Sequence, residues 1–174
     1  PFDPDDEGPL PLTGPNRLIY LQALEQKILW LSTWIIHHAN HIRPNDGQLK
    51  VGGHQASCAS MVTLMTALYF SVLRPEDRVA VKPHGSPVFH AIQYVLGQQT
   101  QGHLERFRAL GGAQSYPSRT KDADDVDFST GSVGLGVAMT SFASLIQKFI
   151  ETHGWKVGKG RMVAVVGDAE LDEG

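Results

Sequence analysis

Apolar residues recur at helical spacing in three long stretches of the chain. Residues 17–40 place them at steps of three and four, which predicts a helix, and Trp30 and Trp34 add a second stripe that indicates burial on more than one side. Residues 54–73 and the stretch after Gly136 repeat the pattern, and 88–96 and 104–110 predict shorter helices. In the helix expected after Gly136, the apolar face is formed by Ala138, Phe142, Leu145, Ile146, Phe149 and Ile150.

Two short apolar runs predict strands. Residues 78–82 form one, which ends at Pro83 because proline has no N–H to donate to a neighbouring strand. Residues 162–166 are continuously apolar, which is typical of a strand buried on both faces in a parallel sheet. Helices that alternate with short buried strands predict an α/β fold, a parallel sheet with helices on both faces.

Two segments do not fit this alternation. Residues 1–16 hold five prolines and an acidic run, which predicts an extended N-terminal arm. We expect residues 17–174 to form the N-terminal part of a domain that is incomplete at its C-terminal end. The first residue, Pro1, leads us to expect that the natural start was removed or that the chain was excised from a longer one. Residues 115–129 are polar and acidic; we interpret them as a solvated loop, with a mobile lid over a site as the alternative.

Composition narrows the functional classes. A net charge of -3 without a basic cluster argues against nucleic-acid binding. The apolar runs fall short of the roughly 18 residues that a membrane span needs, and no signal peptide is visible, so we expect a cytoplasmic protein. The single cysteine, Cys58, suits a reducing compartment. A buried thiol is the favoured interpretation of Cys58, over a nucleophile assisted by His54.

Asp168 is the first candidate for chemistry, because it directly follows the second predicted strand. Ligands of open α/β sheets bind beyond the carboxyl ends of the strands, and a carboxylate there suits Mg²⁺ or Ca²⁺. A calcium loop with acidic residues at 168, 170 and 172 is one alternative, although its glycine is out of place and no helix precedes it. An acidic turn with a purely structural role is the other.

A glycine-rich segment and several histidines are further candidates. Residues 130–136 lead into a helix and bring the backbone close either to a ligand or to a packed neighbour. His54 and His84 lie beside glycines in predicted loops, where functional histidines are common. His37 and His41 are one helical turn apart, but no third metal ligand is evident, so a solvated helix end is favoured.

Five motifs in this order resemble the transketolase superfamily of thiamine-diphosphate enzymes. The stretch from residue 21 to residue 174 is most similar to the N-terminal domain of homodimeric pyruvate dehydrogenase, its decarboxylating component. Each motif is weak alone, but the ordered set is specific: 52–57 (GGHQAS), 84–87 (HGSP), 115–117 (SYP), 131–136 (GSVGLG) and 167–173 (GDAELDE).

The resemblance implies a role for each matching residue. The catalytic set would be His54, His84, Tyr116 and Glu173, of which the histidines face cofactor and substrate, the tyrosine faces substrate, and the glutamate lies near the subunit interface. Cofactor-binding residues would be Ser57, Gly131, Val133, Gly167, Asp168, Ala169 and Glu170. Asp168 would also be the metal ligand. The implied cofactors are thiamine diphosphate and Mg²⁺ or Ca²⁺, and the implied reaction is cleavage of a C–C bond beside a carbonyl.

Some features depart from the family pattern. Ala169 replaces a glycine of the metal motif, and Lys82 stands where the dehydrogenase branch has a neutral amide. The family's second metal ligand and its cofactor-activating glutamate lie outside these 174 residues, so we expect this chain alone to be inactive. The resemblance further implies a homodimer, a small 2-oxo acid or ketose substrate and possible membership of a multienzyme complex. Transketolase proper and a non-catalytic binding or assembly module are the alternatives.

Overall fold

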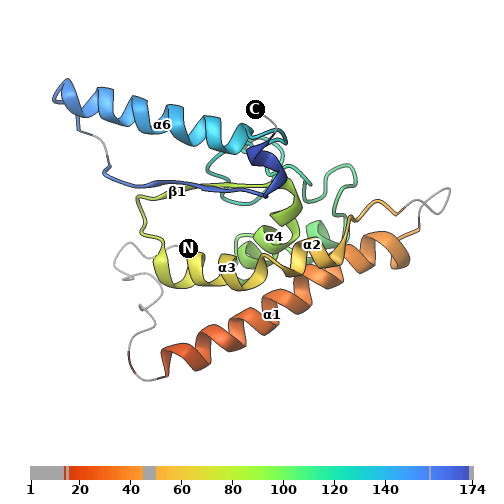
Figure 1. Ribbon diagram of the computed structural model, residues 1–174. Coiled ribbons are helices and arrows are strands. Elements are labelled where there is room, and N and C mark those ends of the chain that lie inside the picture. The colour runs from red at the N-terminus through yellow and green to blue at the C-terminus, as the bar shows by residue number, and fades with distance from the viewer. Residues whose placement is uncertain (1–13, 15, 45–49, 157, 173–174) are drawn as a thin grey trace.

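Two parallel strands form the centre of the computed structural model, which describes residues 14, 16–44, 50–156 and 158–172 (Figure 1). Strand β1 (Arg78–Val81) pairs with β2 (Met162–Val165), with Arg78 opposite Met162 and Val81 opposite Val165. Parallel neighbours need a crossover connection, and the chain between the strands supplies it with helices. The predicted α/β class and both predicted strands are confirmed. Most of the predicted N-terminal arm lies outside the described residues.

One face of the strand pair is covered by a layer of packed helices. The long helix α1 (Arg17–His37) continues as the π-turn η1 (His38–Ile42), as the apolar pattern predicts. It packs against α2 (Gln55–Ala59), α3 (Val62–Ala67) and α4 (Ser86–Val95). This layer contains most of the buried core, including Ile28, Ile35, Ile36, Met65, Val88 and Ile92.

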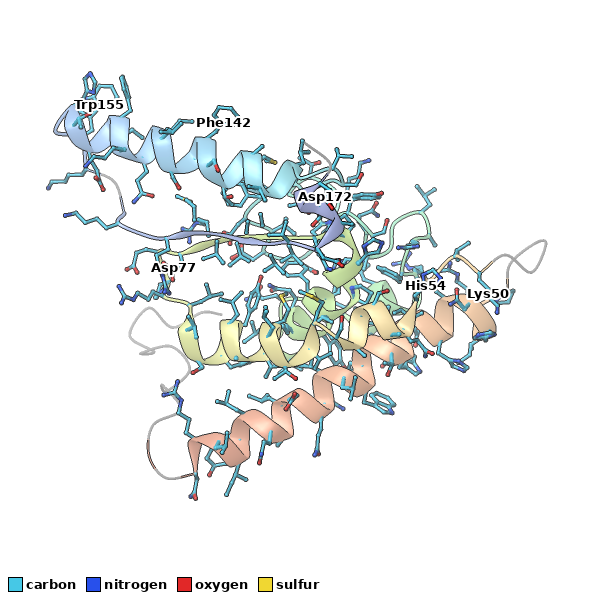
Figure 2. The ribbon with its side chains drawn as sticks, in the orientation of Figure 1. Lys50, His54, Asp77, Phe142, Trp155 and Asp172 are labelled. Atoms are coloured by element: carbon cyan, nitrogen blue, oxygen red, sulfur yellow. The ribbon has the colours of Figure 1, made fainter. Side chains whose placement is uncertain are left out.

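The other face of the strand pair is covered by a single helix, α6 (Leu135–Thr152), which contacts both strands (Figure 1). The predicted helix after Gly136 is therefore confirmed. Much of its apolar face is nevertheless exposed: Phe142 is 65% exposed and Leu145 is 66% exposed. Figure 2 shows Phe142 on the side of α6 that faces away from the strands. The two faces of the strand pair thus differ in how completely their apolar residues are covered.

The second predicted helix, residues 54–73, is interrupted. It divides into α2, α3 and the π-turn η2 (Leu68–Val72), with a tight turn at Ser60 in which the N–H of Met61 donates to the carbonyl of Cys58. The stretch Gln55–Val72 is long and apolar enough, by length and mean hydropathy alone, to cross a membrane. Core helices meet the same criterion, and residues of this stretch pack against α1 and α4.

The prediction of a helix at residues 104–110 is wrong in position. Helix α5 spans Gln101–Glu105, and Thr100 caps its start by accepting the N–H of His103 at 3.4 Å. The chain then reverses in turns, with Arg108 in the left-handed region at φ 62°. Apolar residues in this turn therefore imitate a helical pattern without forming one.

The interpretation of residues 115–129 as a solvated loop is also wrong for most of its acidic side chains. The segment is irregular, as predicted, but Asp124 is buried and Asp122 and Asp127 are partly buried. Asp127 accepts the N–H of Val79 at 2.8 Å, and burial raises the pKa of its carboxyl group. Asp122 and Asp127 fix the backbone because they accept backbone N–H groups, whereas Asp124 binds the side chains of His90 and Gln99.

Candidate functional site

A cavity of about 390 Å³ lies beyond the carboxyl ends of β1 and β2. The 3-10 turn η3 (Pro83–Gly85) leaves β1 there, and η4 (Ala169–Leu171) follows β2. This edge of a parallel sheet is where α/β proteins bind ligands. The cavity is lined by Ser57, Ser60, Lys82, Pro83, His84, Tyr116, Ser132, Gly167, Asp168, Ala169 and Glu170.

The fold brings together many of the residues singled out in the sequence. They come from four separated segments: helix α2, the turn after β1, the irregular loop and the turn after β2. Predicted site residues that line the cavity are Ser57, His84, Tyr116, Gly167, Asp168, Ala169 and Glu170. Their individual roles in catalysis or cofactor binding stay predictions.

Other predicted site residues lie outside the lining. His54 is exposed at the start of α2 (Figure 2), and Gly131 and Val133 flank the lining residue Ser132. Glu173 lies outside the described residues. The N–H of Gly52 donates to the side-chain oxygen of Asn40 at 2.6 Å, so it is not available to a ligand. A Cβ at position 52 would meet the carbonyl oxygen of Ile36 at 2.6 Å, so this glycine serves close packing.

The glycine-rich segment is tied to the end of β1. The Thr130 hydroxyl donates to the carbonyl of Val81 at 2.7 Å, and the Thr130 N–H donates to Pro117 at 3.1 Å. Val133 then adopts φ 60° and Gly134 φ 71°, directly before α6. A β-branched residue in the left-handed region costs on the order of 1–3 kcal/mol and is held by its surroundings. This strained turn at the cavity edge agrees with a functional use of the backbone.

The turn after β2 is closed by its own side chain. The N–H of Gly167 donates to Glu170 Oε2 at 2.8 Å, so Glu170 has a structural role in addition to lining the cavity. The amine of Lys82 lies against Gly167, since a Cβ at that glycine would stand 3.0 Å from Lys82 Nζ. A cation from the end of β1 therefore meets the backbone at the end of β2.

Lys82 and Asp168 make the cavity suitable for a phosphorylated cofactor with a divalent metal. Among residues 14, 16–44, 50–156 and 158–172, no group of three or more His, Cys, Asp or Glu side chains could hold a metal ion. Mg²⁺ is commonly held by one or two carboxylates together with substrate phosphates, so Asp168 alone suits a metal shared with a diphosphate. The ammonium of Lys82 would supply positive charge to the same anion. The residues present therefore fit thiamine diphosphate with Mg²⁺.

The alternative chemical sites find less support. Glu170 turns back on Gly167, which removes one ligand from the calcium loop considered above. The rings of His37 and His41 lie 5.1 Å apart on an exposed helix end, as favoured from the sequence. Cys58 is completely buried, and burial raises the pKa of its thiol to about 11. A nucleophilic role for this cysteine is therefore wrong, and the interpretation as a buried thiol is confirmed.

Tyr116 lies in the cavity wall on a short loop that the side chain of Asp122 holds together. The carboxylate of Asp122 accepts the N–H of Gln114 and the N–H of Ser118, each at 2.8 Å, and so binds both sides of the loop. Tyr116 is 48% exposed between these anchors. The acidic residues of this region thus hold a predicted site residue in place.

Four lining residues were not predicted as site residues: Lys82 and Pro83, which directly follow β1, and the serines Ser60 and Ser132. Ser60 lies three residues after Ser57, and its hydroxyl donates to the Ser57 carbonyl at 2.9 Å. Ser132 lies between two residues that the resemblance did indicate. Spacing relative to those residues was the available signal for both serines.

No family model matches the chain. Among curated proteins, it is 31% identical over 174 residues to the pyruvate dehydrogenase E1 component of Cupriavidus necator, covering 94% of the chain and 19% of the relative. The corresponding protein of Haemophilus influenzae is 27% identical, covering 87% of the chain and 18% of the relative.

Other branches also match. The 1-deoxy-D-xylulose-5-phosphate synthase of Syntrophotalea carbinolica is 30% identical, over 94% of the chain and 23% of the relative. The chain thus spans about a fifth of the length of the first relatives it matches. All of these relatives are members of the thiamine-diphosphate-dependent transketolase superfamily, and the chain, whose predicted motifs meet at one cavity, is similar to part of them.

Proposed function

We propose that this chain forms the diphosphate-binding part of a thiamine-diphosphate- and Mg²⁺-dependent enzyme that decarboxylates a 2-oxo acid, most like a pyruvate dehydrogenase E1 component. The observation that carries the proposal is the cavity at the strand ends, where Lys82, His84, Tyr116 and Asp168 meet. The similarity to two pyruvate dehydrogenase E1 components supports this branch over the others.

The side chains divide the work by charge and position. Asp168 would hold the metal, and Lys82 would hold the diphosphate. When bound, thiamine diphosphate supplies a nucleophilic carbon and an electron sink for C–C cleavage. His84 is exposed at the cavity and suits proton transfer near neutral pH, while Tyr116 would orient the substrate.

Lys82 keeps a second function open. An ammonium in the cavity also favours a phosphorylated ketose, the type of substrate expected for transketolase proper. Assays of the full-length protein separate the two: pyruvate with an artificial electron acceptor against a phosphorylated ketose with an aldose acceptor. Turnover in the first assay supports the proposal, and turnover confined to the second replaces it with ketol transfer.

Asp168→Asn tests the cofactor site itself. In the full-length protein we expect the affinity for thiamine diphosphate in the presence of Mg²⁺ to fall by on the order of a hundredfold, because an amide cannot replace the anionic metal ligand. Titration calorimetry measures the change. Asp172→Asn is the matched control, since Asp172 is exposed and does not line the cavity. Equal binding by the wild type and Asp168→Asn would instead favour a non-catalytic binding or assembly module.

We further propose that the outer face of α6 pairs with a second copy of the chain. Helix α6 has 18 residues, of which only Lys148 and Glu151 are charged. At 1.5 Å per residue, the helix is roughly 27 Å long. The face exposes Phe142, Leu145, Ile146 and Phe149. Exposed apolar faces of this kind mark association sites, and an uncharged face is compatible with a two-fold symmetric contact.

Leu145→Asp tests this pairing against Lys148→Asp, an exposed position on the same helix. Sedimentation of the full-length protein should show a monomer for Leu145→Asp and a dimer for Lys148→Asp. A Leu145→Asp protein that stays dimeric would contradict the pairing. Unfolding of Leu145→Asp alone would also contradict it, because the face would then be covered by its own chain.

A further inference from the structure

A histidine that no role above uses lies in the interior beside the loop of Tyr116. His90, on α4, and Asp124, in the irregular loop, both have side chains with 0% exposure. Nδ1 of His90 contacts Asp124 Oδ2, and Nε2 lies 2.7 Å from the carbonyl oxygen of Gln114. Both ring nitrogens therefore face acceptors.

Two acceptors require two donors. A neutral imidazole carries one N–H, so it would leave one nitrogen lone pair facing an oxygen. Between imidazole and carboxyl, a shared proton resides on the imidazole, whose ordinary pKa is higher. From this geometry we infer that His90 is a buried imidazolium that acts as a positioning residue, holding the Tyr116 loop against the cavity.

The surroundings of the ring favour the charged form. The Gln99 amide donates to the second oxygen of Asp124, so both carboxylate oxygens are engaged. The rings of Phe89 and Phe107 pack edge-on against His90 and exclude water. The remaining titratable neighbours are Asp122, which adds negative charge, and His103, which contacts Gln99 at 3.0 Å.

The pKa of His90 follows from two opposed effects. Burial alone would lower it, but the hydrogen bond and charge of Asp124, together with the Gln114 carbonyl and the charge of Asp122, raise the pKa above its ordinary value. A raised pKa means that the stabilisation is complete below the ordinary value for histidine. It is lost as the pH rises through the higher pKa of the folded state.

The link to the site is short. Gln114, which accepts from His90, precedes Tyr116 by two residues, and Asp124 lies two residues after the Asp122 that staples the same loop. The imidazolium thus joins the start and the end of the loop to α4, the helix that follows His84. Loss of one proton from His90 would leave a lone pair against the Gln114 carbonyl and release the loop at its base.

Hydrogen–deuterium exchange of the full-length protein tests the inference without substrate or cofactor. Asp124→Asn keeps the shape of the side chain but removes the charge that holds the second proton, and His90→Gln removes the ring. Each should accelerate exchange at residues 113–124, corrected for intrinsic rates, by on the order of tenfold or more, with α1 unchanged as the reference for an intact fold. Asp125→Asn is the control, because Asp125 is an exposed neighbour with the same charge.

The pH profile distinguishes positioning from simple packing. From about pH 6 to pH 10, wild-type protection of residues 113–124 should fall with rising pH, and Asp124→Asn should move that fall to lower pH. A wild-type profile that is flat over this range, or equal profiles for Asp124→Asn and Asp125→Asn, would overturn the inference. The positioning role of His90 does not depend on the proposed function; only the substrate role of Tyr116 rests on it. If Tyr116 has that role, Asp124→Asn should raise the KM for the substrate and leave thiamine diphosphate affinity unchanged.

Discussion

The charged residues at the two ends of the β1–β2 pair have opposite environments. At the amino ends, Asp77 is buried and accepts the N–H of Arg161 at 2.7 Å, the Arg161 guanidinium at 3.0 Å and the N–H of Arg74 at 2.9 Å. At the carboxyl ends, Lys82 and Asp168 line a cavity of about 390 Å³. Figure 2 labels Asp77 at the first end and Asp172 just beyond the second.

The difference separates a structural charge from a charge that is open to a ligand. Asp77 is surrounded by donors of its own chain, and hydrogen bonds from Arg161 lower the pKa of its carboxyl group. Asp168 is exposed in the cavity and able to bind a ligand. A charge whose partners are all internal stabilises the fold, whereas a charge left open at the ligand-binding edge of the sheet serves binding. Aspartate is thus enclosed by internal donors one residue before β1 and open to the cavity three residues beyond β2.

Replacing Asp77 should have the largest effect on stability. In Asp77→Asn, an amide N–H₂ would face the Arg161 guanidinium, so donors would meet donors at a buried position. We expect the midpoint of thermal unfolding to fall by several degrees, measured by calorimetry, with the affinity for thiamine diphosphate unchanged below the transition. The control is Glu76→Gln, the exposed neighbour. Equal unfolding midpoints for Asp77→Asn and Glu76→Gln would contradict a structural role for the charge of Asp77.

Acid should remove the stabilisation that Asp77 provides at the amino ends of the strands. Because the pKa of Asp77 is lowered in the folded state, its stabilisation is present above the ordinary value of about 3.9 and is lost as the pH falls through the folded value. The difference in unfolding midpoint between wild type and Asp77→Asn should therefore shrink as the pH falls below about 4. Calorimetry of both proteins across this range measures it. If the difference in unfolding midpoint stays constant down to low pH, the stabilisation by Asp77 comes from packing and not from its charge.

At the carboxyl end, Thr130→Val removes the hydroxyl that donates to Val81 at the end of β1. Valine keeps the shape, so we expect a loss of about 1–2 kcal/mol in the free energy of unfolding, from one unsatisfied buried carbonyl. Thiamine diphosphate should also bind more weakly, because the strained turn at Val133 loses its anchor. Urea unfolding and titration calorimetry measure the two effects. Stability loss without any change in binding would show that the glycine-rich turn does not contribute to the site.

The sequence predicted the elements whose pattern depends only on local burial. Helix α1 and the strands were found because apolar spacing reports which side is covered. Asp168, His84 and Tyr116 meet at the cavity because strand ends and the turns after them share one edge of a parallel sheet. The ordered motifs were therefore a stronger guide to the site than any one residue.

What the sequence missed depends on contacts between distant segments. The position of α5 was misjudged because Arg108 reverses the chain between Phe107 and Leu110, two apolar residues at helical spacing. The acidic loop was taken as solvated because its partners, His90 on α4 and Val79 on β1, lie 34 and 48 residues away. Charge alone does not reveal burial when the compensating group is that remote. Helix α6 shows the opposite case: its apolar pattern predicted the helix, but the pattern did not reveal that this apolar face is left exposed.

Lys82→Gln is the mildest test of the carboxyl end, because glutamine restores the neutral amide expected at this position. The lysine amine lies beside the partly exposed turn at Gly167, so its removal should leave the unfolding midpoint nearly unchanged. Affinity for thiamine diphosphate should fall by roughly threefold to tenfold, the range for one partly screened charge pair. The loss should be greatest at low salt, because ions screen the lysine of the wild type and glutamine has no charge to screen. Titration calorimetry at two salt concentrations measures both effects, with Lys121→Gln, an exposed cation outside the cavity lining, as control. Unchanged cofactor affinity with weaker binding of a phosphorylated ketose would assign Lys82 to the substrate and favour ketol transfer as the reaction.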